Sequence, residues 1–262
     1  MEQIFQHFRK EEQSFIEQVG GWIRETEDRY APKLTDFLDP REQFIVQAIA
    51  GQNEEIVTHS YSKFEDVERK RMLISPSYFV PTDQDFSVTM FEISYPSKFV
   101  TLEHPDVLGT LMSLGLDRSK FGDIRVDGER IELAVVSEVA DFVRLNITSI
   151  GKSKVQVQEL TEEHLFLLNT ETWVEESHTV SSMRLDTIIA SLFNISRQKA
   201  STFIHGGKVK VNWVVRDQPA FELHESDLIS IRGFGRIRLG MIEGRTKKDK
   251  IRLQVGRMEP KS

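Results

Sequence analysis

The last third of the chain alternates apolar residues with cations over several short stretches. Valine alternates with lysine from Lys208 to Asn212, and isoleucine and leucine alternate with basic residues in Arg236–Leu239 and Lys250–Leu253. Successive side chains of a strand point to opposite faces of a sheet. The pattern therefore predicts a sheet with one apolar face, which other elements must cover, and one cationic face suited to a phosphate backbone.

Two short helices are predicted before these strands. The apolar positions of the first follow helical spacing and form one face: Leu185, Ile188, Ile189 and Leu192. Ser196 is placed to cap a second helix that runs from Arg197 to about Ile204, and Gly206-Gly207 ends it. Helices with one apolar face are what the predicted sheet needs to cover its own apolar side.

The charge of the chain is divided unevenly along its length. Residues 181–262 carry 16 Lys and Arg against 8 Asp and Glu, a net charge of +8, whereas residues 1–180 carry 18 against 33, a net charge of −15. Such a division predicts that the C-terminal third binds a polyanion. A solvated basic face without a partner is the alternative.

The N-terminal segment is predicted to begin with two helices and to continue with strands. Apolar residues from Ile4 to Ile23 fall mostly three and four positions apart, which is typical of one helical face. A second helix is predicted to begin at Asp39-Pro40-Arg41-Glu42, where Asp39 and Glu42 form a capping box, and to end at Gly51. Two stretches favour strands: 56–61 and 72–74.

The middle of the chain has the order strand, helix, hairpin, helix, strand. The strands are expected at 88–95, 124–126, 131–136 and 155–157, with Asp127-Gly128 as the hairpin turn, and the helices at 104–114 and 138–147. This βαββαβ order predicts a ferredoxin-like sandwich of the RNA-recognition-motif type. The strands lack the aromatic signature of nucleic-acid-binding members, which favours a scaffold role. Residues 171–180 connect to the basic part and include a further candidate strand. We therefore expect an α+β protein with three parts: 1–80, 81–180 and 181–262.

Composition excludes several classes of protein. The chain has no cysteine, so disulfides, thiol nucleophiles and iron–sulfur clusters are excluded. Its apolar runs are too short to span a bilayer and its first residues do not form a signal peptide, so we expect a soluble, cytoplasmic protein. We find no phosphate-binding loop, no nucleophile elbow and no metal-ligand spacing, and therefore expect no catalytic residue, metal or cofactor.

The basic part resembles the S4 RNA-binding domain. The resemblance rests on about fifty residues in order: Met183–Asp186, Ser196-Arg197 with Lys199-Ala200, Gly207–Asn212 and Asp227–Gly233. Two positions depart from the pattern, because Trp213 and Ser226 stand at turns where the family often has glycine. The departures bear on turn geometry more than on RNA binding.

The whole chain is similar to the YlmH family of bacterial S4-domain proteins. The similarity includes Leu38–Glu42, Gly115–Ile124, Gly233–Arg236 and Thr246–Lys248. The resemblance implies a role in ribosome-associated quality control, with binding to rRNA and tRNA on large ribosomal subunits that carry an obstructed peptidyl-tRNA, and a link to cell division. It implies RNA and the large subunit as partners, without a membrane or a small-molecule cofactor.

The RNA contacts are expected on the S4-like part. Arg184 and Arg197 are expected to hold phosphates at the paired helices, and further residues extend the patch: Lys199, Lys208, Lys210, Asn212, Arg232 and Arg236. Trp213 is expected in a core or an interface, or else stacked on a base.

Three alternatives stay open. The acidic front half is a candidate for an RNA-modifying or RNA-hydrolysing site, which a pocket of carboxylates with shifted pKa values would favour. A division-associated scaffold without an RNA role is the other rival. Arg69-Lys70-Arg71 is a basic run inside the acidic portion, for which we favour a charged loop over a second RNA contact.

Overall fold

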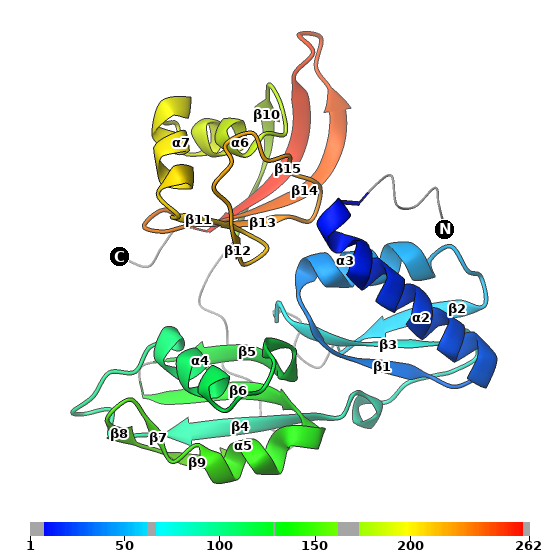
Figure 1. Ribbon diagram of the computed structural model, residues 1–262, viewed down its shortest axis with the longest axis vertical. Helices are drawn as coiled ribbons and strands as arrows, with labels where there is room; N and C mark the ends of the chain where they lie inside the picture. Colours follow the sequence, from blue (N-terminus) through cyan, green and yellow to red (C-terminus); the bar gives the residue numbers. More distant parts are fainter. Residues whose placement is uncertain (1–7, 62–66, 128, 162–172, 259–262) are drawn as a thin grey trace. The chain divides into compact units, whose positions relative to one another are not determined.

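The computed structural model describes the chain apart from residues 1–7, 62–66, 128, 162–172 and 259–262 (Figure 1). The chain forms two compact units, residues 1–169 and 170–262. Each unit has its own hydrophobic core and is described by itself.

The first part of the N-terminal unit is a three-stranded sheet with two helices on one face (Figure 1). The order of the strands is β1-β3-β2, and both neighbouring pairs are antiparallel. The core joins Val19 of α2, Val46 of α3 and Met72 of β3, each fully buried. The elements are η1 (Lys10–Glu12), α2 (Gln13–Arg29), β1 (Lys33–Leu38), α3 (Pro40–Ala50), β2 (Ile56–Ser60) and β3 (Lys70–Pro76).

The predicted start of the second helix is confirmed. The Asp39 carboxylate accepts a hydrogen bond from the backbone N–H of Glu42 at 2.9 Å, and the Glu42 carboxylate accepts one from the N–H of Asp39 at 2.8 Å. The first helix runs through Gly20-Gly21 to Arg29, while the first residues of the predicted stripe lie outside the described residues. Strand β1 was not predicted.

The second part of this unit has the predicted βαββαβ order. Its four-stranded sheet has the order β5-β6-β4-β9 with every neighbouring pair antiparallel, which is the ferredoxin-like arrangement. Helices α4 and α5 cover one face, where Phe91, Val107 and Val143 are fully buried. The elements are η2 (Asp83–Phe86), β4 (Val88–Ser94), α4 (His104–Ser113), η3 (Arg118–Lys120), β5 (Phe121–Val126), β6 (Arg130–Val136), η4 (Ser137–Val139), α5 (Ala140–Asn146), β7 (Ser149–Ile150), β8 (Ser153–Lys154) and β9 (Gln156–Glu159).

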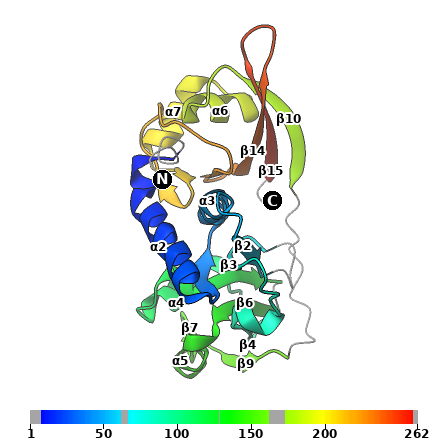
Figure 2. The same cartoon turned by 90° about the vertical axis from the view of Figure 1, so that its right-hand side faces the viewer.

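The C-terminal unit is a six-stranded antiparallel sheet with two helices packed against it (Figure 2). The order of the strands is β10-β15-β14-β13-β11-β12. The elements are β10 (Val174–Val180), α6 (Leu185–Leu192), α7 (Arg197–His205), β11 (Val209–Val211), β12 (Val214–Val215), β13 (Leu228–Ile231), β14 (Gly235–Arg245) and β15 (Ile251–Met258). Both predicted helices and the predicted strands are present, and β10 confirms the candidate strand before the basic part.

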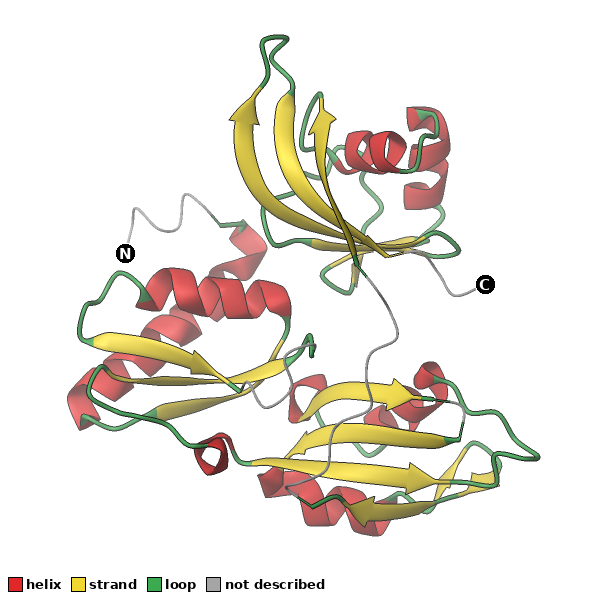
Figure 3. Cartoon of the chain, turned by 180° about the vertical axis from the view of Figure 1, so that it is seen from behind, coloured by secondary structure: helices red, strands yellow, loops and turns green. Residues whose placement is uncertain are grey.

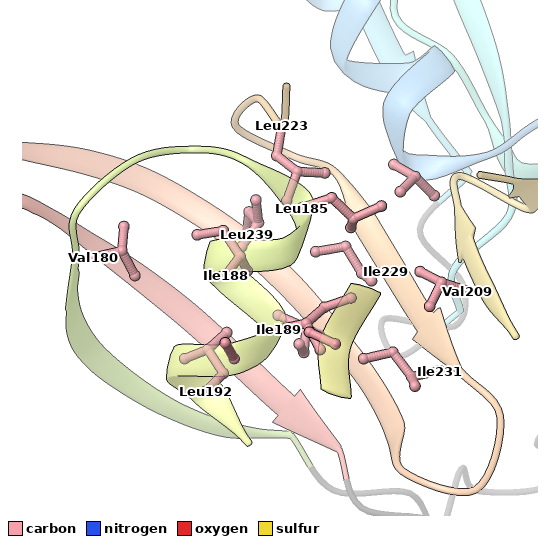
Figure 4. Close-up of a cluster of buried hydrophobic side chains, with 14 of the residues drawn as sticks. Val180, Leu185, Ile188, Ile189, Leu192, Val209, Leu223, Ile229, Ile231 and Leu239 are labelled. Carbon is pink, nitrogen blue, oxygen red and sulfur yellow. The ribbon is translucent and has the colours of Figure 1, made fainter. Parts of the chain in front are cut away.

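The predicted alternation of this sheet is also confirmed. Val209 and Val211 are fully buried and Ile237 lies in the same core, whereas Lys210 and Arg238 are exposed on the other face. The apolar face packs against Leu185, Ile188 and Ile189 of α6 (Figure 4).

The corner between α7 and the sheet is held by aromatic rings. Phe234, in the turn between β13 and β14, lies with its ring centroid 5.5 Å from Phe193 and 5.0 Å from Phe203. The glycines around it have positive φ values, +84° at Gly233 and +102° at Gly235. They lie at the turn between β13 and β14, where positive φ values favour glycine.

Candidate nucleic-acid interface

The two arginines expected to bind phosphate share one carboxylate. Arg184 donates from Nε and Nη2 to the two oxygens of Asp186 at 3.0 and 3.1 Å. Arg197 donates from Nη2 to Oδ2 of the same residue at 2.6 Å. The sequence pattern therefore brings together two residues from different helices, and the carboxylate that joins them was not among the predicted site residues.

The backbone position of each of the two arginines is set by the start of a helix. Arg184 is the N-cap residue of α6, and its backbone forms a β-bridge with Glu222. Arg197 is the first residue of α7, directly after Ser196, whose hydroxyl accepts a hydrogen bond from the N–H of Lys199 at 3.1 Å. Both guanidinium groups thus lie at helix N-termini, where the helix dipole favours an anion.

Asp186 holds its charge in this cluster. Burial alone would raise the pKa of Asp186, but the hydrogen bonds from Arg184 and Arg197 outweigh it and bring the pKa below its ordinary value. The cluster therefore carries two positive charges and one negative charge at neutral pH.

The cluster is exposed on its cationic side only. The side chain of Asp186 is 5% exposed, whereas those of Arg184 and Arg197 are 43% and 57% exposed. A guanidinium has five N–H donors, so both arginines keep donors for a solvent-side anion while Asp186 holds their orientation. Two adjacent forks of this kind fit phosphate oxygens, which arginine binds through paired hydrogen bonds.

The other predicted cations lie on different parts of the same unit. Lys208 and Arg232 are exposed neighbours, joined by the backbone hydrogen bond from Arg232 N–H to the Lys208 carbonyl at 2.9 Å. Lys210 and Arg236 flank Ser230 in register across three strands and share the outward face of the sheet. Lys199 is exposed on α7.

Asn212 has a structural role that accounts for its side chain. Its amide nitrogen donates to Asp227 at 2.8 Å, and its amide oxygen accepts from the N–H of Leu228 at 2.9 Å. Asn212 and Trp213 have φ values of +47° and +64°, and they form the two-residue turn between β11 and β12. Two consecutive positive φ values are the signature of a type I′ hairpin turn. We therefore leave Asn212 out of the RNA contacts proposed below.

An aromatic residue that was not predicted for the site lies on the outward face of the sheet. The Trp173 ring centroid is 5.8 Å from the guanidinium carbon of Arg236 and 4.8 Å from that of Arg238. A side chain at Gly256 would collide with this arrangement, because a Cβ there would lie 2.8 Å from the Glu175 carboxylate and 3.1 Å from the Trp173 ring. Trp173 is far from both arginines in sequence, so spacing gave no signal for their contact.

The ferredoxin-like sheet does not offer an RNA-recognition-motif surface. In that motif, aromatic residues on the open face of the sheet stack on bases. Here Phe37 of β1 packs on Ala134 and Val136 at one end of this face, and Glu92 lies opposite Glu132 further along. Glu132 is fully buried and Glu92 is partly buried, and the described strand residues of this face include no exposed aromatic ring.

The basic run at 69–71 is structural, as favoured, but it begins a strand and is not a loop. Arg71 is 2% exposed. It donates to the carbonyls of Thr35 and Ser87, both at 2.8 Å, and so joins the two sheets of the N-terminal unit. Arg69 donates to the Phe37 carbonyl at 3.0 Å.

Three carboxylates among the described residues of this unit have raised pKa values, which is the observation that an enzymatic front half would require. Burial raises the pKa of Asp39 and Asp123, and burial together with the charge of Asp39 raises the pKa of Glu42 to about 7. All three are bound to backbone N–H groups. Asp39 and Glu42 cap α3, and Asp123 accepts from Glu68 and Arg69 at 2.8 and 3.0 Å. These bonds give them structural roles at the start of α3 and directly before the start of β3.

The described residues contain neither a metal-binding cluster nor a membrane-spanning helix. No group of three or more histidine, aspartate or glutamate side chains among them lies close enough together to hold a metal ion. None of the helices in the described ranges combines the length and apolar character needed to cross a membrane.

Comparison with known proteins identifies the family. Residues 81–164 match a family model described as "Putative RNA-binding domain in YlmH", and residues 183–229 match the S4 domain. The chain is 42% identical over 259 residues to the ribosome-associated protein quality control protein P2 of Bacillus subtilis (strain 168), covering 99% of this chain and 100% of that protein. The solved structure of the cell division protein ylmH from Streptococcus pneumoniae matches with a TM-score of 0.52 and 33% identity, over 59% of this chain and 94% of that one. The chain therefore belongs to the YlmH family of S4-domain RNA-binding proteins.

Proposed function

We propose that the protein is a non-catalytic, cytoplasmic RNA-binding factor that binds the large ribosomal subunit and acts on complexes with an obstructed peptidyl-tRNA. The B. subtilis relative is named for ribosome-associated quality control, which supports a role of this protein on ribosomes. Under this proposal rRNA and tRNA are the ligands, and the three-part division at residues 80 and 180 separates an N-terminal platform of two parts from the RNA-binding domain.

The cluster of Arg184, Asp186 and Arg197 carries the proposal. It places two oriented guanidinium groups at two helix N-termini in the part of the chain that matches the S4 domain. Lys199, Lys208, Lys210, Arg232 and Arg236 extend the cationic surface. An arrangement of this kind contacts phosphates and recognises folded RNA by its shape. Ribosomal RNA is folded in this way.

The division of charge supports a fixed orientation on RNA. A net charge of +8 in residues 181–262 attracts the phosphate backbone, and a net charge of −15 in residues 1–180 is repelled by it. The acidic part would therefore remain available as a platform or a steric element. The name of the S. pneumoniae relative, a cell division protein, supports a link to cell division.

Sucrose gradients of cell extract test the proposal. We expect the protein to migrate with large subunits at low salt and to leave them as the salt concentration rises, because phosphate contacts are salt-dependent. Arg197→Glu should move it to the top of the gradient at every salt concentration. Lys98→Glu makes the same change in charge at an exposed position of the N-terminal unit and should leave migration unchanged. Migration with small subunits only, or with neither subunit, would overturn the ribosomal assignment and leave a general RNA binder. Absence of any RNA affinity at physiological salt would favour a scaffold without an RNA role.

A further inference from the structure

The C-terminal sheet extends into a ribbon that, within the described residues, has no neighbouring strand on one side. Strand β13 pairs with β14 only from Gly235 to Arg238. Beyond this point β14 continues with β15 to the turn at residues 246–250, and the end of this ribbon stands clear of the helices of its own unit (Figure 3). We call residues 241–252 the arm. From Leu239, the last buried residue of β14, to Arg245 the strand extends by about 20 Å at roughly 3.3 Å per residue.

The arm is exposed over most of its length. Residues 241–245 and 247–250 are all exposed, and Met241 and Ile242 keep 59% and 39% of their surface accessible. These two adjacent apolar side chains are therefore accessible for contact with another molecule.

The arm is also strongly basic. It contains five cations, Arg245, Lys247, Lys248, Lys250 and Arg252, and two acids, Glu243 and Asp249. Asp249 pairs with Arg245 at 2.8 Å. Within the described residues, Lys247, Lys248 and Lys250 form no ion pair. The tip therefore presents three lysines whose charge the protein does not compensate.

We propose that the arm binds the phosphate backbone of a second RNA segment, separate from the one held by Arg184 and Arg197. This inference rests on the proposed function, and it adds a second point of contact on the same RNA assembly. Two separate contacts on one unit fix the orientation of that unit on a folded RNA, which one cluster of phosphate contacts does not. Met241 and Ile242 would pack against riboses and base edges beside the contacted phosphates.

The geometry of the arm favours RNA over a protein strand as its ligand. An exposed edge strand is a template for strand addition only when it is regular. The pairing of β14 with β15 shifts register between Leu239 and Ile242 and again between Ile242 and Gly244. Such bulges bend and twist a strand, so this edge is a poor template, and its lysines are suited to a polyanion.

The absence of cysteine allows a direct test. Glu243→Cys in the arm, or Gln198→Cys at an exposed position of α7, provides the only attachment point for a hydroxyl-radical probe in the full-length chain. Each labelled protein is bound to purified large ribosomal subunits, and the cleaved rRNA nucleotides are mapped. We expect two sets of cleavages, one from each probe, on different RNA segments.

Charge reversal provides the second half of the test. Lys247→Glu with Lys248→Glu should abolish the cleavages from the Glu243 probe, retain those from the Gln198 probe, and make the slope of log affinity against log salt shallower by about two. The matched control, Lys98→Glu with Lys152→Glu, changes two exposed lysines of the N-terminal unit and should change neither set. Cleavage from the α7 probe alone would overturn the role of the arm, leave the proposed function intact, and indicate a protein ligand or none. Cleavage from neither probe would overturn both.

Discussion

The Arg197 guanidinium lies 2.6 Å from the carboxylate of Asp186, and it shares this carboxylate with Arg184. The relationship joins the two arginines that we propose as phosphate ligands, which are separated in sequence, into one unit. Each arginine is oriented by the same buried acid, and the acid in turn depends on both arginines for its charge. Residues that share a partner in this way do not contribute independently to binding.

The first prediction concerns this coupling. Arg184→Ala and Arg197→Ala should each weaken RNA binding, and the double variant should lose less than the sum of the two losses, with a coupling free energy of about 0.5–2 kcal/mol. A double-mutant cycle on the affinity for large subunits measures it. Strict additivity would show that the two arginines act separately, and a large drop in melting temperature with unchanged affinity would show that they are structural.

The second prediction concerns Asp186. Because the folded state lowers its pKa, the carboxylate stabilises the fold above about pH 4, its unfolded value, and this contribution is lost as the pH falls through the folded value. Asp186→Asn should therefore lower the free energy of unfolding by about 1–2 kcal/mol at pH 7, and by progressively less below pH 4. Denaturant titrations over this range measure the effect. A difference from the wild type that does not change with pH would contradict the account.

The third prediction concerns a turn residue that replaces glycine. Ser226 has a φ value of +66°, a conformation that costs a residue with a side chain about 1–2 kcal/mol. Ser226→Gly relieves this strain but gives the unfolded chain more freedom, so the net gain in stability should be about 0.5–1 kcal/mol. Ser230→Gly, in the regular strand β13, is the matched control and should destabilise the protein. Thermal melts distinguish the two, and a lower melting temperature for Ser226→Gly would refute the idea.

The fourth prediction concerns Glu42. Its pKa is raised from 4.5 to about 7 in the folded chain, so between these values the folded state binds a proton that the unfolded state has released. The free energy of unfolding should therefore fall as the pH rises from 4.5 to 7. Glu42→Gln keeps an acceptor for the N–H of Asp39 and should remove the contribution of Glu42 to this dependence, with a gain above about pH 7 of at most about 3 kcal/mol. Asp39 and Asp123, whose pKa values are also raised, keep their own contributions.

The exposed Glu17→Gln should keep the wild-type dependence, and Glu42→Gln should keep full RNA binding. A loss of RNA binding in Glu42→Gln without a loss of stability would revive the enzymatic alternative for the front half.

The fold of the C-terminal unit was largely predictable because its signals are local. The alternation at Lys208–Asn212, the apolar spacing of α6 and the Ser196 cap each depend on neighbouring residues, and the structure contains all three. The capping box at Asp39 was predictable for the same reason.

The unpredicted features depend on contacts between distant residues. Strand β1 contains only six residues, and it pairs with β3, which lies beyond α3 and β2 in the chain. From the sequence alone, Arg71 is expected on the surface. It is buried because carbonyl and carboxylate groups from distant segments accept its hydrogen bonds. The approach of Trp173 to Arg236 likewise follows from the pairing of β10 with β15, which sequence spacing does not encode.

The most direct test of the central claim is the salt dependence of binding to purified large subunits by the full-length chain. With about four to six phosphates contacted, the slope of log affinity against log salt should be roughly −3 to −5. Arg184→Ala with Arg197→Ala should make the slope shallower by about two, because each arginine gives up one phosphate. A slope that is the same for the wild type and the double variant would contradict the assignment of RNA binding to the arginines held by Asp186.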